Sequence, residues 1–253
     1  MPELTPSAFE AAYGFRRQTR RGRPLHGAKL GVVILDTRFQ RFPGDIGNAA
    51  TFDYPVQYAI AHGMVRGTEI RPDAETLKVF YRAVDDLVAL GVDGITTSCG
   101  FLAIMQPQLA AHSPVPVAAS SLLQVPMLQR MMPDGRQVGV LTAKKSSLTA
   151  EHFAGVGVTA PVPVEGMPDG GVFRRNLEQG APEIDYAAQE REVVEAAGKL
   201  IADHGDIGAI VLECTNLSPY SARIEEAFGL PVYDVITLLD WFHAGLRPRR
   251  YAR

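Results

Sequence analysis

The chain has 253 residues, of which 46% are hydrophobic, and its formal net charge is -3 at pH 7. This length can bury one large core or two small ones, and the weak net charge argues against broad electrostatic binding to nucleic acid or to an anionic membrane. No apolar run approaches the roughly 20 residues that span a bilayer, and the first residues lack a signal-peptide core. We therefore expect a cytoplasmic protein with neither a nucleic-acid nor a membrane partner.

Basic residues crowd both ends of the chain: Arg16, Arg17, Arg20, Arg21, Arg23, Arg247, Arg249, Arg250 and Arg253. Runs of this kind usually form solvated faces. We interpret residues 1–27 as a basic N-terminal arm that lies outside the folded domains.

The first half of the folded region alternates predicted strands and helices. Residues 29–35 (KLGVVIL) form an apolar run typical of a buried parallel strand. Residues 73–90 carry apolar side chains at helical spacing and end at a glycine, which predicts a helix. Further strands are predicted at 94–98 and 115–119, followed by a helix at 122–132.

The pattern restarts at residues 137–142 (QVGVLT), which we predict to be a strand. A long amphipathic helix follows at 185–204, then a strand at 207–212. Ser218 before Pro219 is typical of a helix N-cap, and we predict a short strand at 231–233 before a final helix. The segment 165–182 is rich in Gly and Pro; it is either a lid or a mobile connection, and we favour the latter.

The two halves share an order of features, because GVDGITTSCG in the first corresponds to GDIGAIVLECT in the second. Cys214 follows Cys99 by 115 residues, and the flanking glycines keep nearly the same offset. We therefore predict an α/β fold with two similar parallel-sheet domains related by a pseudo-twofold axis and a site between them. The predicted domains are 28–120 with 235–253, and 121–234.

Each cysteine follows a predicted strand, at the edge of the sheet where ligands bind in open parallel sheets. One thiol on either side of a cleft suits proton transfer at a carbon centre, with one thiolate base and one thiol acid. Free thiols have a pKa of about 8.5, and we expect helix N-termini near 102–104 and 218–219 to lower it. Gly100 would allow close backbone approach, while Thr215 and Asn216 would bind a carboxylate.

Other interpretations of the cysteines remain open at this point. Free cysteine is often simply a small buried hydrophobe. The two thiols could also form a redox pair if their Cα atoms lie within about 7 Å. Metal binding is less favoured, since neither cysteine has a CxxC partner or a histidine at ligand spacing.

Three segments, TTSCGF, LECTNLSPYS and LDTRFQRFPGDIGNAATF, resemble the aspartate/glutamate/hydantoin racemase superfamily of cofactor-independent, two-cysteine isomerases. The resemblance implies no cofactor and no metal, with Cys99 and Cys214 as the acid/base pair. It is compatible with a homodimer. Additional substrate-binding residues expected from this resemblance and from their places at strand ends are Asp36, Asn48, Ser98 and Thr142.

The function implied is a racemase or epimerase, independent of pyridoxal phosphate, that acts at the α-carbon of a small carboxylate such as an amino acid. Gly100-Phe101 stands where amino-acid racemases commonly have Asn-Thr, and Asn216 where glutamate racemases have His, so the substrate stays open. The alternatives are a hydantoin racemase acting on a cyclic amide, a maleate isomerase-like enzyme, and a non-catalytic two-domain binding protein. Arylmalonate decarboxylases of the superfamily use one cysteine, so the second argues against decarboxylation.

Overall fold

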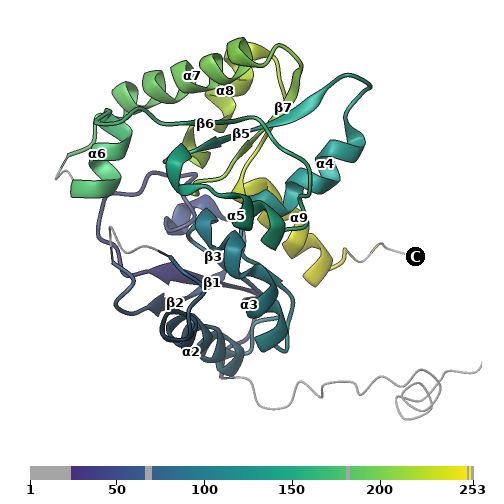
Figure 1. The fold of residues 1–253 in the computed structure, drawn as a ribbon. Helices are drawn as coiled ribbons and strands as arrows, with labels where there is room; N and C mark the ends of the chain where they lie inside the picture. The colour runs from purple at the N-terminus through teal and green to yellow at the C-terminus, as the bar shows by residue number, and fades with distance from the viewer. Residues whose placement is uncertain (1–23, 66–69, 181–182, 250, 252–253) are drawn as a thin grey trace, which may run out of the picture.

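The computed structural model describes residues 24–65, 70–180, 183–249 and 251. Two parallel four-stranded sheets form the two halves of the molecule, with helices around them (Figure 1). Most of the predicted basic arm, and the arginines at 250 and 253, lie outside the described residues.

The first sheet has the strand order β2-β1-β3-β4. Its strands are β1 (Leu30–Leu35), β2 (Val56–Ala61), β3 (Gly94–Thr97) and β4 (Val117–Ala118). Its main helices are α2 (Ala74–Leu90) and α3 (Gln106–His112). Phe80, Val84 and Leu87 of α2 are fully buried in the core of this half. The helical spacing seen in the sequence therefore corresponds to the face that covers the sheet.

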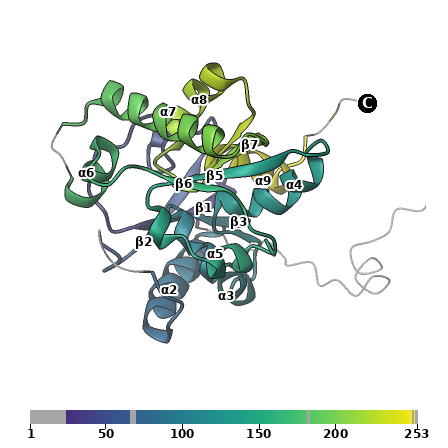
Figure 2. The ribbon, with the colours of Figure 1, turned by 45° about the horizontal axis from the view of Figure 1, so that its top comes forward.

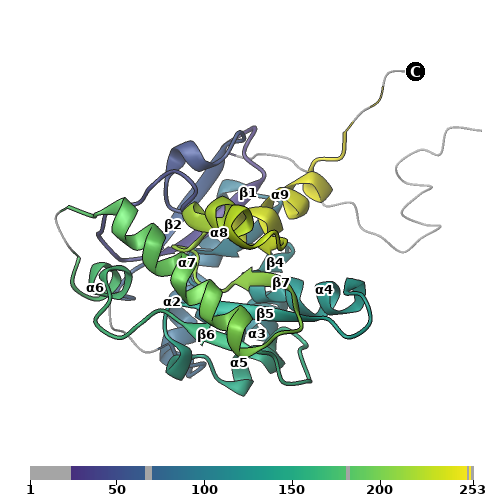
Figure 3. The same ribbon diagram turned by 90° about the horizontal axis from the view of Figure 1, so that it is seen from above.

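The second sheet has the equivalent order β6-β5-β7-β8. Its strands are β5 (Gln137–Thr142), β6 (Val164–Gly166), β7 (Ile207–Leu212) and β8 (Val232–Tyr233). Its helices are α4 (Val125–Met131), α5 (Ala150–Gly155), α6 (Val172–Gln179), α7 (Tyr186–Asp203) and α8 (Ser221–Phe228). The matching strand orders confirm the predicted pair of similar α/β units. Figures 1 and 2 show α7 and α8 at the opposite end of the molecule from α2, and in Figure 3, seen from above, α7 and α8 lie side by side on the second sheet.

Local signals explain where the two long helices begin. The side chain of Asp73 accepts the backbone N–H of Thr76 at the start of α2, and Asp185 accepts that of Ala188 at the start of α7. Gly91 ends α2 with φ 90°, a left-handed conformation that glycine adopts without strain. Of these residues, Gly91 was the one that the sequence analysis used, as the end of the predicted helix.

Helix α9 (Val235–Leu246) follows the last strand and returns to the first sheet. Val235 and Leu239 pack with Leu30 and Val32 of β1. A Cβ at Gly94 would lie 2.6 Å from a Leu246 methyl group, so the glycine that opens β3 makes room for this helix. The domain limits at 120 and 235 stay a prediction, but this packing accords with the return of the chain to the first half.

Contacts between the halves involve backbone as well as side chains. A Cβ at Gly155, the last residue of α5, would lie 2.2 Å from the carbonyl oxygen of Ala103, in the 3-10 helix η2 (Gly100–Met105). A Cβ at Gly100, directly after Cys99, would lie 2.1 Å from the carbonyl oxygen of Glu213. The two halves therefore contact each other closely at the level of the cysteines.

One local expectation was wrong. Ser218 does not cap a helix: it is the first residue of the 3-10 helix η5 (Ser218–Tyr220), and its buried hydroxyl has no hydrogen-bond partner within the described residues. The segment 165–182 contains α6, and whether it is a lid or a mobile connection stays a prediction. In the described part of the chain, no helix has the length and apolar character needed to cross a membrane.

Candidate active site

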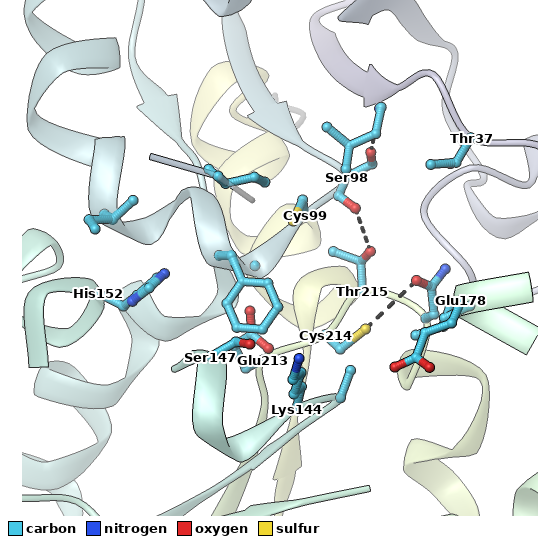
Figure 4. A pocket seen from close by; sticks show the side chains of 18 of the residues that line it. Thr37, Ser98, Cys99, Lys144, Ser147, His152, Glu178, Glu213, Cys214 and Thr215 are labelled. Carbon is cyan, nitrogen blue, oxygen red and sulfur yellow. Dashed lines mark hydrogen bonds between the residues drawn. The ribbon is translucent and has the colours of Figure 1, made fainter. Parts of the chain in front are cut away.

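A cavity of about 890 Å³ lies where the carboxyl ends of the two sheets meet. Both cysteines line it, one from each half. Figure 4 shows Cys99 and Cys214 approaching the same space, with Lys144 and Glu178 at its edges and His152 farther to one side. The predicted placement of a site at the strand ends corresponds to this cavity.

Cys99 lies two residues after the last residue of β3 and directly before η2. Burial raises the pKa of its thiol to about 12, and the charge of Glu213 adds to the shift. Backbone N–H groups of Phe101 and Leu102 hydrogen-bond to the sulfur and oppose the shift. The turn supplies donors as expected, but the prediction of a lowered pKa was wrong because desolvation dominates.

Cys214 occupies the matching place after β7, two residues after the last residue of that strand. Burial, followed by the charge of Glu213, raises the pKa of its thiol well above the ordinary value. Its thiol points to the Asn216 side-chain oxygen, with an Sγ to Oδ1 distance of 3.7 Å. A thiol that has an acceptor beside it is stabilised in its protonated form.

Two polar contacts hold the second cysteine loop against the first half of the chain. The buried Thr215 hydroxyl donates to the Ser98 carbonyl at 2.8 Å (Figure 4). The Asn216 amide donates to Asp45 Oδ2 at 2.5 Å, and Asp45 Oδ1 accepts from Arg41 at 2.8 Å. These contacts leave the Asn216 oxygen directed to Cys214.

Glu213 lies between the last residue of β7 and Cys214, and its side chain is 1% exposed. Its Oε2 accepts the Thr142 hydroxyl at 2.6 Å, whereas its Oε1 has no hydrogen-bond partner in the described residues. Burial raises the pKa of this carboxyl to about 7, although the Thr142 hydrogen bond lowers it. Sequence analysis missed Glu213; the sign available was a lone acidic residue after an apolar strand and before a cysteine.

Among the predicted substrate-binding residues, four line the cavity with the two cysteines: Ser98, Gly100, Thr215 and Asn216. Thr142 is fully buried and contacts the cavity only through Glu213. Asn48 caps a short 3-10 helix and donates to the Arg41 carbonyl at 2.8 Å. Asp36 lies 3.9 Å from His62 and lines a separate, smaller cavity. The structure therefore does not bring Asp36 or Asn48 to the cysteines.

Basic and hydroxyl side chains offer binding groups for an anion at the cavity wall. Lys144, directly after Ala143, is exposed and has no ion-pair partner in the described part of the chain. Ser146 and Ser147 follow in the same loop. Arg174 of α6 also lines the cavity but is paired with Glu178 at 2.5 Å. Lys144 is therefore better placed than Arg174 to bind a carboxylate.

Phe101 and His152 also line the cavity, and their rings meet edge to face with centroids 5.5 Å apart. The Nδ1 atom of His152 accepts the backbone N–H of Thr149 at 3.1 Å. Burial lowers the pKa of this imidazole. A neutral ring with Nε2–H as its remaining donor is the form these contacts favour. Across the described residues, no group of three or more His, Cys, Asp or Glu could hold a metal ion.

No family model matches the chain. A dimethylsulfoniopropionate lyase of Durusdinium sp. clade D is 32% identical to it over 253 residues, which cover 93% of this chain and 83% of that protein. The chain belongs to the dimethylsulfoniopropionate lyase family. Dimethylsulfoniopropionate lyase 5 of Emiliania huxleyi is 29% identical over 94% of this chain, which spans about half (48%) of that relative.

Solved structures share the fold of the chain at low sequence identity. An unliganded arylmalonate decarboxylase superposes with a TM-score of 0.56 at 15% identity, over 89% of this chain and 95% of the other. A glutamate racemase of Bacillus anthracis gives 0.57 at 14% identity, over 88% and 83%. The chain therefore has the fold of arylmalonate decarboxylase and glutamate racemase, in agreement with the fold that the resemblance of the sequence segments implied. The named lyases support the prediction of an enzyme, although we had expected an isomerase.

Proposed function

We propose that this protein cleaves dimethylsulfoniopropionate, or a close sulfonium carboxylate, by β-elimination. The observation that carries the proposal is a cavity in which a thiol with two backbone N–H donors faces the same space as an unpaired lysine, in a chain 32% identical to a dimethylsulfoniopropionate lyase. The substrate has a carboxylate at one end and a dimethylsulfonium group on the carbon β to it. The cavity supplies a basic side chain for the former and a candidate base for the proton between them.

The reaction requires one proton acceptor. A Cys99 thiolate takes the proton from the α-carbon, and the electrons of that C–H bond form the double bond. The C–S bond breaks and its electron pair leaves on sulfur, so dimethyl sulfide departs as a neutral molecule and acrylate remains. The leaving group needs no proton, in contrast to the amine or alkoxide leaving groups that require a general acid.

The raised pKa of both thiols is compatible with this substrate. A buried thiolate is costly while no cation is near it, and burial keeps both thiols protonated in the empty cavity. A sulfonium carries a fixed positive charge, which lowers the pKa of a neighbouring thiol when it enters the cavity. The base would therefore form mainly when the substrate is bound.

Cys99 is the better candidate for the base. Two backbone N–H groups hydrogen-bond to its sulfur, and such donors stabilise a thiolate. Cys214 has one backbone donor, from Asn216, and directs its thiol toward the Asn216 oxygen. We assign Cys214 the role of a neutral hydrogen-bond donor toward the carboxylate on which negative charge develops.

The test is headspace measurement of dimethyl sulfide, with acrylate followed by proton NMR, after incubation of the purified protein with dimethylsulfoniopropionate. We expect stoichiometric release of both products. Lys144→Met should raise KM because it removes the proposed partner of the substrate carboxylate, while Lys145→Met, in the same loop but paired with Glu165 at 3.4 Å, serves as the matched control. Absence of dimethyl sulfide from a folded protein with both thiols reduced would refute the proposal.

Racemisation or epimerisation of a small carboxylate is the second candidate. It is favoured by the entry of one thiol from each half of the fold into a single cavity. Two-base inversion predicts that α-protons of aspartate, glutamate or a 5-substituted hydantoin exchange in D₂O, and that both enantiomers are formed. Exchange lost in both single-cysteine variants would favour this function over elimination.

A further inference from the structure

The carboxyl of Glu213 is not required by the elimination described above, yet it lies against both cysteine segments. It precedes Cys214 in the chain, and on its other side it touches the residue that follows Cys99. A Cβ added at Gly100 would lie 2.2 Å from Glu213 Oε1 and 2.1 Å from the Glu213 carbonyl oxygen. Glu213 therefore occupies the space that a side chain at position 100 would fill.

The Glu213 carboxyl has few hydrogen-bond donors for a charged group. It has one donor, the Thr142 hydroxyl, on Oε2, and its Oε1 is buried without a hydrogen-bond partner in the described part of the chain. A buried carboxylate ordinarily has several donors or a cation. The arrangement suits the neutral acid better than the anion.

Titratable groups from both halves line the same cavity as Glu213. They include the thiols of Cys99 and Cys214, the ammonium group of Lys144 at the cavity wall, and the His152 ring beyond Phe101 (Figure 4). The charge on Glu213 raises the pKa of both thiols. Two negative charges in so small a buried volume repel each other strongly.

We propose that Glu213 is a positioning residue that controls the ionisation of the cysteine pair: its carboxyl is protonated whenever Cys99 or Cys214 is a thiolate. The site then holds one negative charge at a time, on the carboxyl in the resting protein above neutral pH and on a thiol during turnover. Glu213 acts through the thiols and need not touch the substrate. The inference deepens the proposed function, but the charge relation does not depend on which substrate is bound.

The test measures thiolate formation in the absence of substrate. Alkylation by iodoacetamide is followed from pH 6.5 to 9.5 in Cys99→Ser and Cys214→Ser backgrounds, each of which leaves one thiol. Glu213→Gln keeps the shape and removes the charge, so we expect about a tenfold or larger rise in alkylation rate at pH 8, or about one pKa unit or more. Glu151→Gln, which removes an exposed carboxyl from the same cavity, is the matched control and should change neither rate.

A second variant keeps the proposal testable if Glu213→Gln does not fold. Thr142→Val leaves the carboxyl in place but removes its donor, which favours the neutral acid and should raise the alkylation rate in the same direction by a smaller factor. Thr142→Ser retains the hydroxyl and should behave as the parent. Unchanged alkylation rates in folded Glu213→Gln or Thr142→Val protein would overturn the inference, whereas failure to release dimethyl sulfide would count against the proposed function alone.

Discussion

Cys99 and Cys214 follow equivalent strands of two sheets with the same strand order, but the loops around them differ in chemistry. The first loop continues with Gly100 and Phe101 and offers the sulfur backbone donors. The second is preceded by a buried acid and continues with Thr215 and Asn216, whose side chains are tied to the other half. The two thiols are therefore not equivalent, although the two sheets have the same strand order.

This difference bears on the reaction. Inversion at a carbon centre in both directions needs two groups that can exchange the roles of acid and base. An elimination with a neutral leaving group needs one base, and the second thiol is free to serve another purpose. Unequal surroundings of the two cysteines thus agree better with the lyase proposal than with the racemase that the sequence led us to expect.

The largest expected effect comes from replacing each cysteine by serine. Cys99→Ser should lower kcat by about 10³-fold or more, because it removes the proposed base, whereas Cys214→Ser should cost about ten- to a hundredfold, because a hydroxyl can still donate a hydrogen bond. Dimethyl sulfide release under saturating substrate measures both. Equal losses in the two variants, with circular dichroism unchanged, would restore the symmetric two-base mechanism.

An intermediate effect is expected on the pH dependence of stability. The folded protein holds the Glu213 proton up to a pKa of about 7, while the unfolded chain releases it near 4.5. The free energy of unfolding should therefore fall by about 3 kcal/mol as pH rises from 4.5 to 7, and this loss is fully present above 7. Glu213→Gln should flatten that part of the profile in urea titrations.

The exposed Glu151→Gln change should leave the slope as in the parent protein. A slope that persists in folded Glu213→Gln protein would mean that another group of the first or second half carries the titration. The buried acid Glu213 would then no longer distinguish the second cysteine loop from the first in its titration.

The smallest effect is expected from the hydrogen bond that joins the two cysteine loops. Thr215→Val removes the donor of the Ser98 carbonyl and should lower the free energy of unfolding by about 1 to 2 kcal/mol, because a buried acceptor loses its partner. Thr215→Ser keeps the hydroxyl and should cost less. Urea unfolding with an unchanged m-value measures the difference in free energy of unfolding. Equal stability of the valine and serine variants would argue that this hydrogen bond contributes nothing to stability.

Much of the fold was predictable because its signals are local. Apolar runs marked β1, β5 and β7, and apolar residues at helical spacing, followed by a glycine, marked α2 and α7. Strand β2 was missed because its sequence, VQYAIA, has only two β-branched residues, Val56 and Ile60, and only its two alanines are buried. Strand β6 has only three residues, all half-buried.

The sequence identified the two cysteines of the site, but not the groups that surround them. Both cysteines were identified from their places after strands, whereas Glu213 acquires its character from burial that one sequence does not display. The contact between Asp45 and Asn216 joins residues 171 apart in the chain, and no local pattern announces it. We expected the thiol pKa values to be lowered, whereas burial raises them. The sequence indicated the backbone donors of the turns but not the burial of the thiols.

Helix α9 packs on β1 and against Gly94, although all eight strands of the described residues precede it in the chain. As the polypeptide emerges from the ribosome, the first sheet is complete in its strands long before the helix that covers this face has been made. Leu30 and Val32 gain their contacts with Val235 and Leu239 only after that helix has been synthesised. The final packing of the first half therefore depends on residues made after both sheets, although its own strands are made early.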